Sequence, residues 1–196
     1  AANVSVVSAS FCTQGNDLYA NGGARINGNG WSITGGGGVS SKTSWNLLGG
    51  YIEFDMDPSG ASNSVNTNLY TSSMEMPNCG SGCYCDIQAG AHPSCMEMDI
   101  IENNGHCWGQ TTTHTWPNNN GDCDRAGCWS SMGLPQGKFH VHAAFYTNGW
   151  LTVTINGVKN DHYTPTPSGN SNDYVVQTMN RIGAAIESSQ WFGWVP

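Results

Sequence analysis

The segment from Lys138 to Ile155 constrains the fold more than any other, because its side chains alternate between polar and apolar. Alternation with a period of two is typical of a strand that is buried on one face. A three-residue turn, Thr147-Asn148-Gly149, with Gly149 left-handed, would pair Tyr146 with Trp150. This register places on one face Val141, Ala143, Phe145, Leu151, Val153 and Ile155. On the other face it places His140, His142, Tyr146 and Trp150. We therefore predict an antiparallel hairpin with one buried face.

The composition extends this prediction to the whole chain. The 26 glycines among 196 residues, together with abundant Asn, Ser and Thr, indicate turns between short strands. Long amphipathic helices need Lys, Glu, Ala and Leu, which are scarce here. A second alternating segment, residues 51–57, carries Ile52, Phe54 and Met56 on its apolar side. We predict an all-β sandwich that residues 1–196 form as a single domain.

The formal net charge of −8 bounds the choice of partners. Nucleic acids and anionic membranes bind basic surfaces, so neither is expected as a partner. The sequence has no run of 18 apolar residues, and no segment is expected to cross a membrane. A neutral polymer such as a polysaccharide is compatible with this charge, and the chain is expected to act as a monomer.

The eight cysteines indicate the compartment. They form an even number and lie mostly in loop-like sequence, which favours an oxidising environment and up to four disulfides. The start at Ala1-Ala2-Asn3 resembles a chain end left by signal-peptide cleavage. Both features predict a secreted, extracellular protein.

Metal binding is the alternative use of some of these residues. Cys79, Cys83 and Cys85 with the nearby His92 could hold zinc, but they lack a paired Cys-x2-Cys knuckle. His140 and His142 lack an identifiable third ligand. The prediction is therefore that the chain has no metal site and needs no cofactor.

The acids within residues 97–102 are the strongest chemical signal. On a regular strand, Glu97 and Asp99 share one face. Glu102 lies an odd number of residues from both and would point to the opposite face. One extra residue, a bulge at Ile100-Ile101, would turn Glu102 toward the other two, and bulges are common beside active sites. We therefore predict three carboxylates on one face of a bulged strand.

Crowded carboxylates push one another's pKa values apart, which suits a reaction that needs one carboxylate and one carboxylic acid. In a retaining glycosidase two such groups lie about 5–5.5 Å apart; one attacks the anomeric carbon, and the other protonates the leaving oxygen. Glu97 and Glu102 can lean toward each other with Asp99 between them. A calcium site and a solvated acidic strand are the alternatives, although calcium usually recruits loop oxygens.

The hexapeptide Glu97-Met98-Asp99-Ile100-Ile101-Glu102 resembles the Glu-x-Asp-x-x-Glu signature of glycoside hydrolase families 7 and 16, which are retaining β-glucanases. Further pieces resemble family 7 in their order along the chain: Leu47-Leu48-Gly49, Phe54-Asp55-Met56-Asp57, Leu69-Tyr70, Ser73-Met74, Gly82-Cys83-Tyr84-Cys85-Asp86, Cys95 and Cys123-Asp124-x-x-Gly127-Cys128. The resemblance covers residues 47–128. It implies a concanavalin-like β-jelly-roll sandwich with disulfide-stabilised loops.

The resemblance also implies roles for four residues. Glu97 corresponds to the nucleophile, Asp99 to its orienting partner and Glu102 to the general acid/base. His114 falls where the family has a histidine beside the acid/base. The chain is shorter than family 7 enzymes, so the long loops that roof a cellulose tunnel cannot all be present, and Ile101 stands where family 7 usually has Trp. An open cleft and endo action are therefore expected, and the short length also fits family 16.

The apolar face of a sugar packs on aromatic rings, so the expected substrate-binding residues are Trp116, Trp129, Tyr146 and Trp150. The expected function is that of a secreted, endo-acting retaining β-glucanase, with the linkage open between β-1,4, β-1,3 and mixed. A non-catalytic β-glucan-binding protein on the same fold is the alternative, and the complete acid triplet argues against it. A polysaccharide lyase is disfavoured, because only six Lys and Arg residues could neutralise a uronate substrate.

Overall fold

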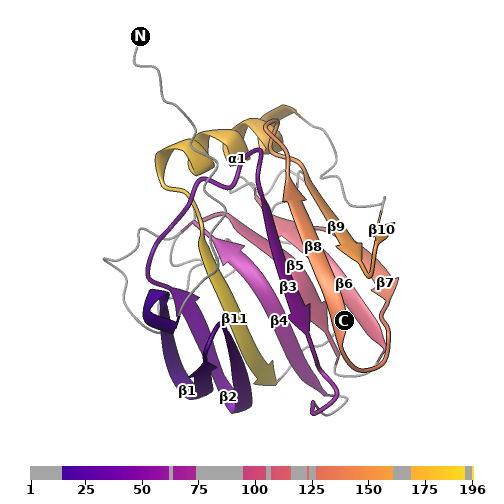
Figure 1. Ribbon diagram of the computed structural model, residues 1–196. Coiled ribbons are helices and arrows are strands. Elements are labelled where there is room, and N and C mark those ends of the chain that lie inside the picture. Colours follow the sequence, from indigo (N-terminus) through magenta and orange to yellow (C-terminus); the bar gives the residue numbers. More distant parts are fainter. Residues whose placement is uncertain are drawn as a thin grey trace.

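The computed structural model describes residues 15–61, 64–73, 95–104, 107–115, 123, 127–160, 169–192 and 196. Within these residues the chain forms two antiparallel sheets (Figure 1). The large sheet has the strand order β1-β2-β11-β4-β5-β6-β7, and the small sheet has the order β10-β9-β8-β3. The predicted all-β sandwich is confirmed. No helix in the described ranges has the length and apolar character needed to span a membrane.

The bounds of the strands follow the turn residues of the sequence. The large sheet consists of β1 (Leu18–Asn27), β2 (Gly30–Ser41), β4 (Val65–Ser72), β5 (Glu97–Asn103), β6 (Trp108–His114), β7 (Cys128–Gly133) and β11 (Ala185–Phe192). The small sheet consists of β3 (Tyr51–Met56), β8 (Phe139–Phe145), β9 (Leu151–Ile155) and β10 (Val158–Asn160). A short 3-10 helix, η1 (Gly15–Asp17), precedes β1, and one α-helix, α1 (Gly169–Arg181), precedes β11.

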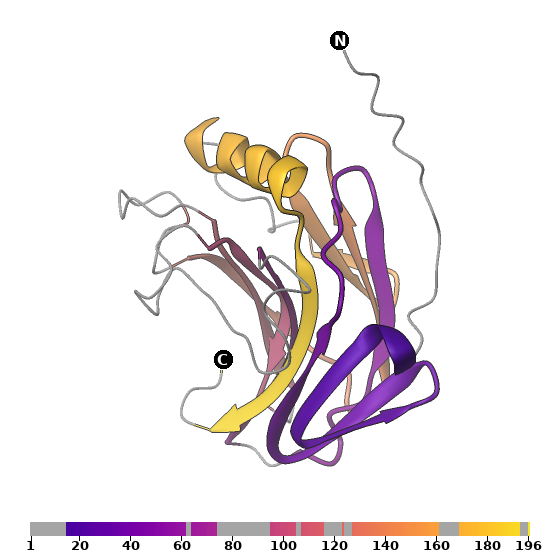
Figure 2. The ribbon, with the colours of Figure 1, turned by 90° about the vertical axis from the view of Figure 1, so that its left-hand side faces the viewer.

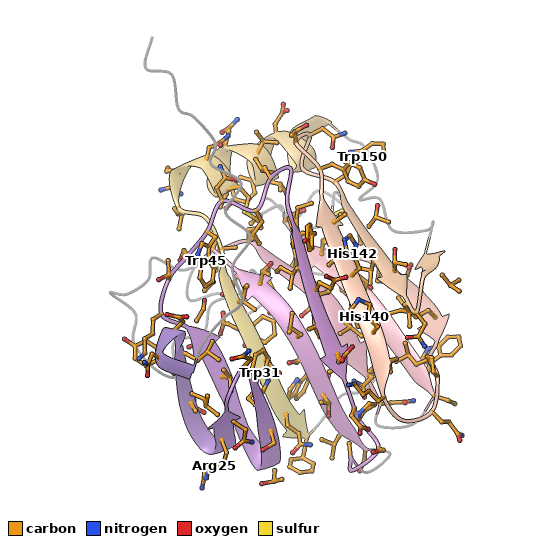
Figure 3. The ribbon with its side chains drawn as sticks, in the orientation of Figure 1. Arg25, Trp31, Trp45, His140, His142 and Trp150 are labelled. Atoms are coloured by element: carbon orange, nitrogen blue, oxygen red, sulfur yellow. A yellow bond between two sulfur atoms is a disulfide. The ribbon has the colours of Figure 1, made fainter. Side chains whose placement is uncertain are left out.

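The hydrophobic core lies between the two sheets. The inner face of β8 and β9 is fully buried, as the alternation predicted, and consists of Val141, Ala143, Phe145, Leu151, Val153 and Ile155. The large sheet supplies the opposing side chains, which include Leu69, Met98, Ile100 and Ile101. Trp31 and Trp45 pack against the same core (Figure 3). Full burial of one large apolar side chain stabilises the folded state by about 1.5–3 kcal/mol relative to leaving that side chain in water.

The hairpin between β8 and β9 has the predicted turn. Gly149 is left-handed, with φ of 86°. The amide of Tyr146 donates to the carbonyl of Trp150 at 2.7 Å, so the three-residue loop lies between them. Phe145 pairs with Leu151 and both face the core, which leaves Tyr146 and Trp150 on the outer side of the small sheet.

Helix α1 was not predicted, because its polar sequence lacks strong helix formers. Val175 and Met179, one turn apart, are both 1% exposed and pack into the core. Tertiary packing therefore outweighs weak intrinsic propensity here. The helix ends before Gly183, which has a φ of 78° and donates its amide to the carbonyl of Thr178 at 3.2 Å. In Figure 2 α1 lies across one end of the molecule, beside the start of the strongly curved β11.

The cysteines follow the expectation only in part. Cys123 and Cys128 form a disulfide, and Cys95 is also disulfide-bonded. Cys107 is an exposed free thiol, so the eight cysteines cannot form four disulfides. The described residues do not include Cys12, Cys79, Cys83, Cys85 and His92. The alternative that Cys79, Cys83, Cys85 and His92 bind zinc therefore stays untested.

Candidate active site

The predicted bulge in β5 is present. Across the β4 side of the strand, Tyr70 pairs with Asp99 and Leu69 pairs with Ile101, so Ile100 is an extra residue. The pairing with β6 shifts between Asp99 and Glu102 in the same way. A bulge of this kind changes the face to which every later side chain points. Glu102 therefore shares a face with Asp99, as the spacing predicted.

The bulge is stabilised by apolar packing in the core and by a hydrogen bond from the neighbouring strand β6. Ile100 and Ile101 are both 0% exposed and belong to the core, so the extra residue adds an apolar anchor behind the acids. The buried hydroxyl of Thr111 donates to the carbonyl of Ile100 at 2.9 Å. This bond satisfies a backbone acceptor at the point where the strand irregularity occurs. The sequence thus specifies the irregularity with apolar packing and one hydroxyl.

Residues that pair directly across antiparallel strands share a face, and this defines the surroundings of the acids. We call the side of the large sheet that is turned away from the core the acid face, and Glu97, Asp99 and Glu102 the acid row. One line across the sheet is Ser72–Glu97–His114. The next is Glu187–Tyr70–Asp99–Thr112–Trp129. The third is Asn68–Glu102–Gln110. The acid face therefore carries polar and ionisable groups from four neighbouring strands.

The acid row is poorly hydrated. Glu97, Asp99 and Glu102 are 4%, 6% and 8% exposed, and His114 is 5% exposed. Like charges in a desolvated site are costly, which favours holding one carboxyl group in its neutral form. The burial of these three acids rules out the alternative that β5 is a solvated acidic strand.

Glu102 has the environment of a proton donor. The side-chain amide of Asn66 donates to its Oε1 at 2.8 Å, and Asn66 is itself 0% exposed. Burial raises the pKa of the Glu102 carboxyl, and the hydrogen bond from Asn66 lowers it by less, so the net shift is upward. Glu102 therefore keeps its proton to a higher pH than an exposed glutamate.

His114 is fixed beside the other two acids. Its Nε2 lies 3.7 Å from Oδ2 of Asp99, and the residue pairs directly with Glu97. Gly127, with φ of 73°, lies so close that an added Cβ would be 2.7 Å from Cε1 of the imidazole. The Cys123–Cys128 disulfide flanks Gly127, and the amide of Thr115 donates to the carbonyl of Cys123 at 2.7 Å. The cysteine motif thus positions His114.

The same three residues define the candidate metal centre in the described part of the chain. Glu97, Asp99 and His114 each offer one ligand atom, and these atoms lie within 4.8 Å of one another. Carboxylate and imidazole ligands of this number suit a divalent transition metal. The glycosidase chemistry that the row suggests requires no metal.

A fourth buried acid, Glu187 on β11, completes the acid face, and sequence reasoning missed it. It is 3% exposed, and burial raises its pKa to about 7. The hydroxyl of Tyr70 donates to its Oε2 at 3.2 Å, and the hydroxyl of Ser72 donates to its Oε1. Residues 185–192 mix polar and apolar side chains on both faces, so the local sequence gives no signal for Glu187. The strand order shows that β11 lies beside β4.

The aromatic residues divide between the two sheets. Trp129 is 63% exposed and lies on the acid face, in line with Asp99. Trp191 pairs with Asn66 on that face and is 39% exposed, a candidate that the sequence did not single out. Trp116 lies outside the described residues.

Tyr146 and Trp150 do not join this group, contrary to the expectation that they lie near the acids. Their hairpin belongs to the small sheet, and its register puts them on the outer side with His140 and His142. Figure 3 labels Trp150, His140 and His142. The two ring nitrogens of His140 each lie 2.9 Å from a carboxylate oxygen, of Asp55 and Glu53 respectively. Period-two alternation assigns residues to a face but does not assign a hairpin to a sheet.

Solved structures of known proteins resemble this chain in fold. A family GH7 cellobiohydrolase from Daphnia pulex superposes with a TM-score of 0.58 at 17% identity, covering 92% of this chain and 66% of that one. The Humicola insolens endocellulase EGI gives a TM-score of 0.63 at 18% identity, covering 87% of this chain and 67% of that one. The chain has the fold of glycoside hydrolase family 7. The predicted jelly roll is thereby confirmed.

A similar fold also occurs in a protein described as a pseudo β-1,3-glucanase. Rv0315 of Mycobacterium tuberculosis, an immunostimulatory antigen and pseudo β-1,3-glucanase, gives a TM-score of 0.51 at 12% identity, covering 90% of this chain and 64% of that one. Protein-family models and curated protein sequences give no match to this chain. At identities below 20%, these structures establish the fold of the chain and not its activity.

Proposed function

We propose that this chain is a secreted β-glucanase that cleaves internal linkages of a β-glucan with retention of configuration. The observation that carries the proposal is the bulge of β5, which brings Glu97, Asp99 and Glu102 to one buried face. Within that row Glu102 has a raised pKa, so it can serve as the acid while Glu97 serves as the nucleophile. A neutral glucan also suits a chain with a net charge of −8.

The reaction takes two steps at these side chains. In the first, a carboxylate oxygen of Glu97 attacks the anomeric carbon while Glu102 transfers its proton to the glycosidic oxygen, which leaves with the bonding electrons. In the second, Glu102 takes a proton from water, and the resulting oxygen displaces Glu97 from the anomeric carbon. The linkage is hydrolysed with two inversions, and both carboxyl groups return to their starting states.

The neighbouring side chains prepare this chemistry. Asn66 donates to Glu102 at 2.8 Å and so fixes the carboxyl group that must reach the leaving oxygen. Asp99 lies between the two glutamates in the row and 3.7 Å from the imidazole of His114. Trp129 and Trp191, exposed on the same face, are the proposed platforms for sugar rings on either side of the row.

The comparisons support this reaction class, since the two family 7 structures are described as an endocellulase and a cellobiohydrolase. A non-catalytic β-glucan-binding protein is the second candidate, because the pseudo β-1,3-glucanase has the same fold. Glucan binding alone does not require three desolvated carboxylates, which cost free energy in the folded state. The complete and buried acid row therefore favours catalysis.

The deciding experiment measures reducing-sugar release from amorphous cellulose, mixed-linkage β-glucan, laminarin and xylan. Glu97→Gln is the test variant, and Glu53→Gln is its control, since Glu53 lies on the outer side of the small sheet. Release that is lost in Glu97→Gln and kept in Glu53→Gln supports the proposal and identifies the linkage. A rapid fall in viscosity at low product yield supports endo action. Binding without release on all four polymers would establish the second candidate instead.

A further inference from the structure

The acid face contains a buried group that the proposed reaction does not use. Glu187 is 3% exposed, so its carboxyl group is desolvated and must be retained against a free-energy cost. Both of its oxygens accept hydrogen bonds, one from Tyr70 at 3.2 Å and the other from Ser72. A single carboxyl group thus joins two hydroxyls of the neighbouring strand β4.

Those two hydroxyls lie next to the acid row. Ser72 pairs directly with Glu97, and Tyr70 pairs directly with Asp99. The charges of Glu97 and Asp99 also act on the phenol of Tyr70: burial, Glu187, Glu97 and Asp99 all raise its pKa. Tyr70 is therefore electrostatically coupled to Glu187 on one side and to the nucleophile and its partner on the other.

We propose that Glu187 is a positioning residue of the active site, which holds Tyr70 and Ser72 in place against Asp99 and Glu97. The inference rests on the proposed function, because it assigns a role in the reaction of Glu97. Glu187 does not touch the substrate in this assignment; it fixes the two side chains that pair with the reacting carboxylate and its neighbour.

The charge state of Glu187 is compatible with this role. Its pKa of about 7 leaves the carboxyl group largely neutral under acidic conditions, where it adds no fourth negative charge to the acid face. On β4 the groups that face it are Tyr70 and Ser72, and on β2 the residue paired with it is the uncharged Ser40. Glutamine has the same shape and is neutral, so it mimics the protonated form.

The test compares two substitutions of Glu187 at pH 5. Glu187→Leu keeps similar volume but removes both acceptors, and it should lower kcat by about 10²-fold with KM changed less than about threefold. Glu187→Gln keeps one acceptor and one donor and should restore kcat to within about threefold of the wild type. The control is Thr71→Val: Thr71 lies between the two hydroxyl residues on the opposite face of β4, and its Oγ1 has no hydrogen-bond partner among the described residues.

A variant that combines three substitutions gives the second readout. Adding Tyr70→Phe and Ser72→Ala to Glu187→Leu should cause little further loss, since the three groups act as one unit. If Glu187→Leu does not fold, the Tyr70→Phe/Ser72→Ala pair removes the same two bonds from β4 and must itself lower kcat about 10²-fold at unchanged KM.

Three results would overturn the inference while leaving the proposed function intact: kcat of Glu187→Leu equal to that of Thr71→Val, equal losses in the Leu and Gln variants, or additive losses in the combined variant. An inactive wild-type protein would be a failure of the proposed function instead.

Discussion

At the scale of single residues, the nucleophile assignment makes the sharpest prediction. Glu97→Gln removes the negative charge that attacks the anomeric carbon and preserves the shape of the side chain. We expect kcat to fall by more than about 10³-fold, as when a catalytic nucleophile is removed, with oligosaccharide binding retained. Initial rates and calorimetric binding measure the two effects separately. Unchanged turnover would remove Glu97 from the mechanism.

The environment of Glu102 predicts a pH dependence. A general acid must be protonated, so kcat/KM should fall on the alkaline side as Glu102 ionises, and its raised pKa moves that limb upward. Asn66 stabilises the ionised form, so Asn66→Ala should move the alkaline limb to still higher pH while lowering kcat. Thr71→Val serves as the control. An alkaline limb that stays in place, or moves to lower pH, would contradict this account of Glu102.

At the scale of the strand, the hydroxyl of Thr111 is one of the groups that support the bulge. Thr111→Val leaves the buried carbonyl of Ile100 without its partner, which costs about 1–3 kcal/mol of unfolding free energy. Thr71→Val removes a hydroxyl that is equally buried but has no partner among the described residues, so it should be neutral or stabilising. Urea denaturation of both variants, with kcat measured in parallel, tests this. Equal effects of the two substitutions would mean that the hydroxyl of Thr111 does not support the bulge.

The loop that positions His114 makes a second prediction at this scale. In Gly127→Ala the new Cβ would lie 2.6 Å from Cγ2 of Thr112 and 2.7 Å from Cε1 of His114, on a backbone with φ of 73°. The imidazole must shift, so we expect lower kcat and a loss of about 1–3 kcal/mol in stability. Gly133→Ala is the matched control, because an added Cβ there meets nothing within 4 Å. Crystallography of the variant would show the displaced ring, and an undisturbed His114 would refute the packing argument.

How far the sequence predicts these elements depends on whether the information is local. The register of β8 and β9 and the bulge of β5 follow from the spacing of a few residues, and both are confirmed. Helix α1 is stabilised by Val175 and Met179 packing into a core made by distant strands, so its own sequence gives little indication of it. The same holds for Glu187, whose partners Tyr70 and Ser72 are more than 100 positions away in the chain.

At the scale of the whole molecule, strand order decided what the sequence left open. The sequence predicts Trp129, Tyr146 and Trp150 as members of one sugar-binding group, but Tyr146 and Trp150 belong to the small sheet and Trp129 to the large one. The pattern of alternation is identical in both sheets, so it could not separate them. Only the sheet topology brings Trp129 and Trp191 to the face of the acid row.

Stability should depend on pH through Glu187. Its folded pKa of about 7 lies above the ordinary value of 4.5, so the folded state binds an extra proton between these values. The stabilisation is complete below about pH 4.5 and is lost as the pH rises through about 7, an effect of about 3 kcal/mol. Urea denaturation of the wild type and Glu187→Gln at pH 4.5 and pH 8 should show the wild type losing this amount relative to the variant. A difference independent of pH would contradict a buried, titrating Glu187.

The inserted residue in β5 also bears on how this fold gains or loses chemistry over evolutionary time. Glu97 and Asp99 precede the bulge and Glu102 follows it, so their common orientation rests on the count of residues between them. Deletion of one isoleucine would send Glu102 into the interior while every acidic residue remained in the gene. Under the proposed function, a single codon loss would therefore abolish hydrolysis. On the same proposal, turnover thus depends on the spacing of the acids as well as on their presence.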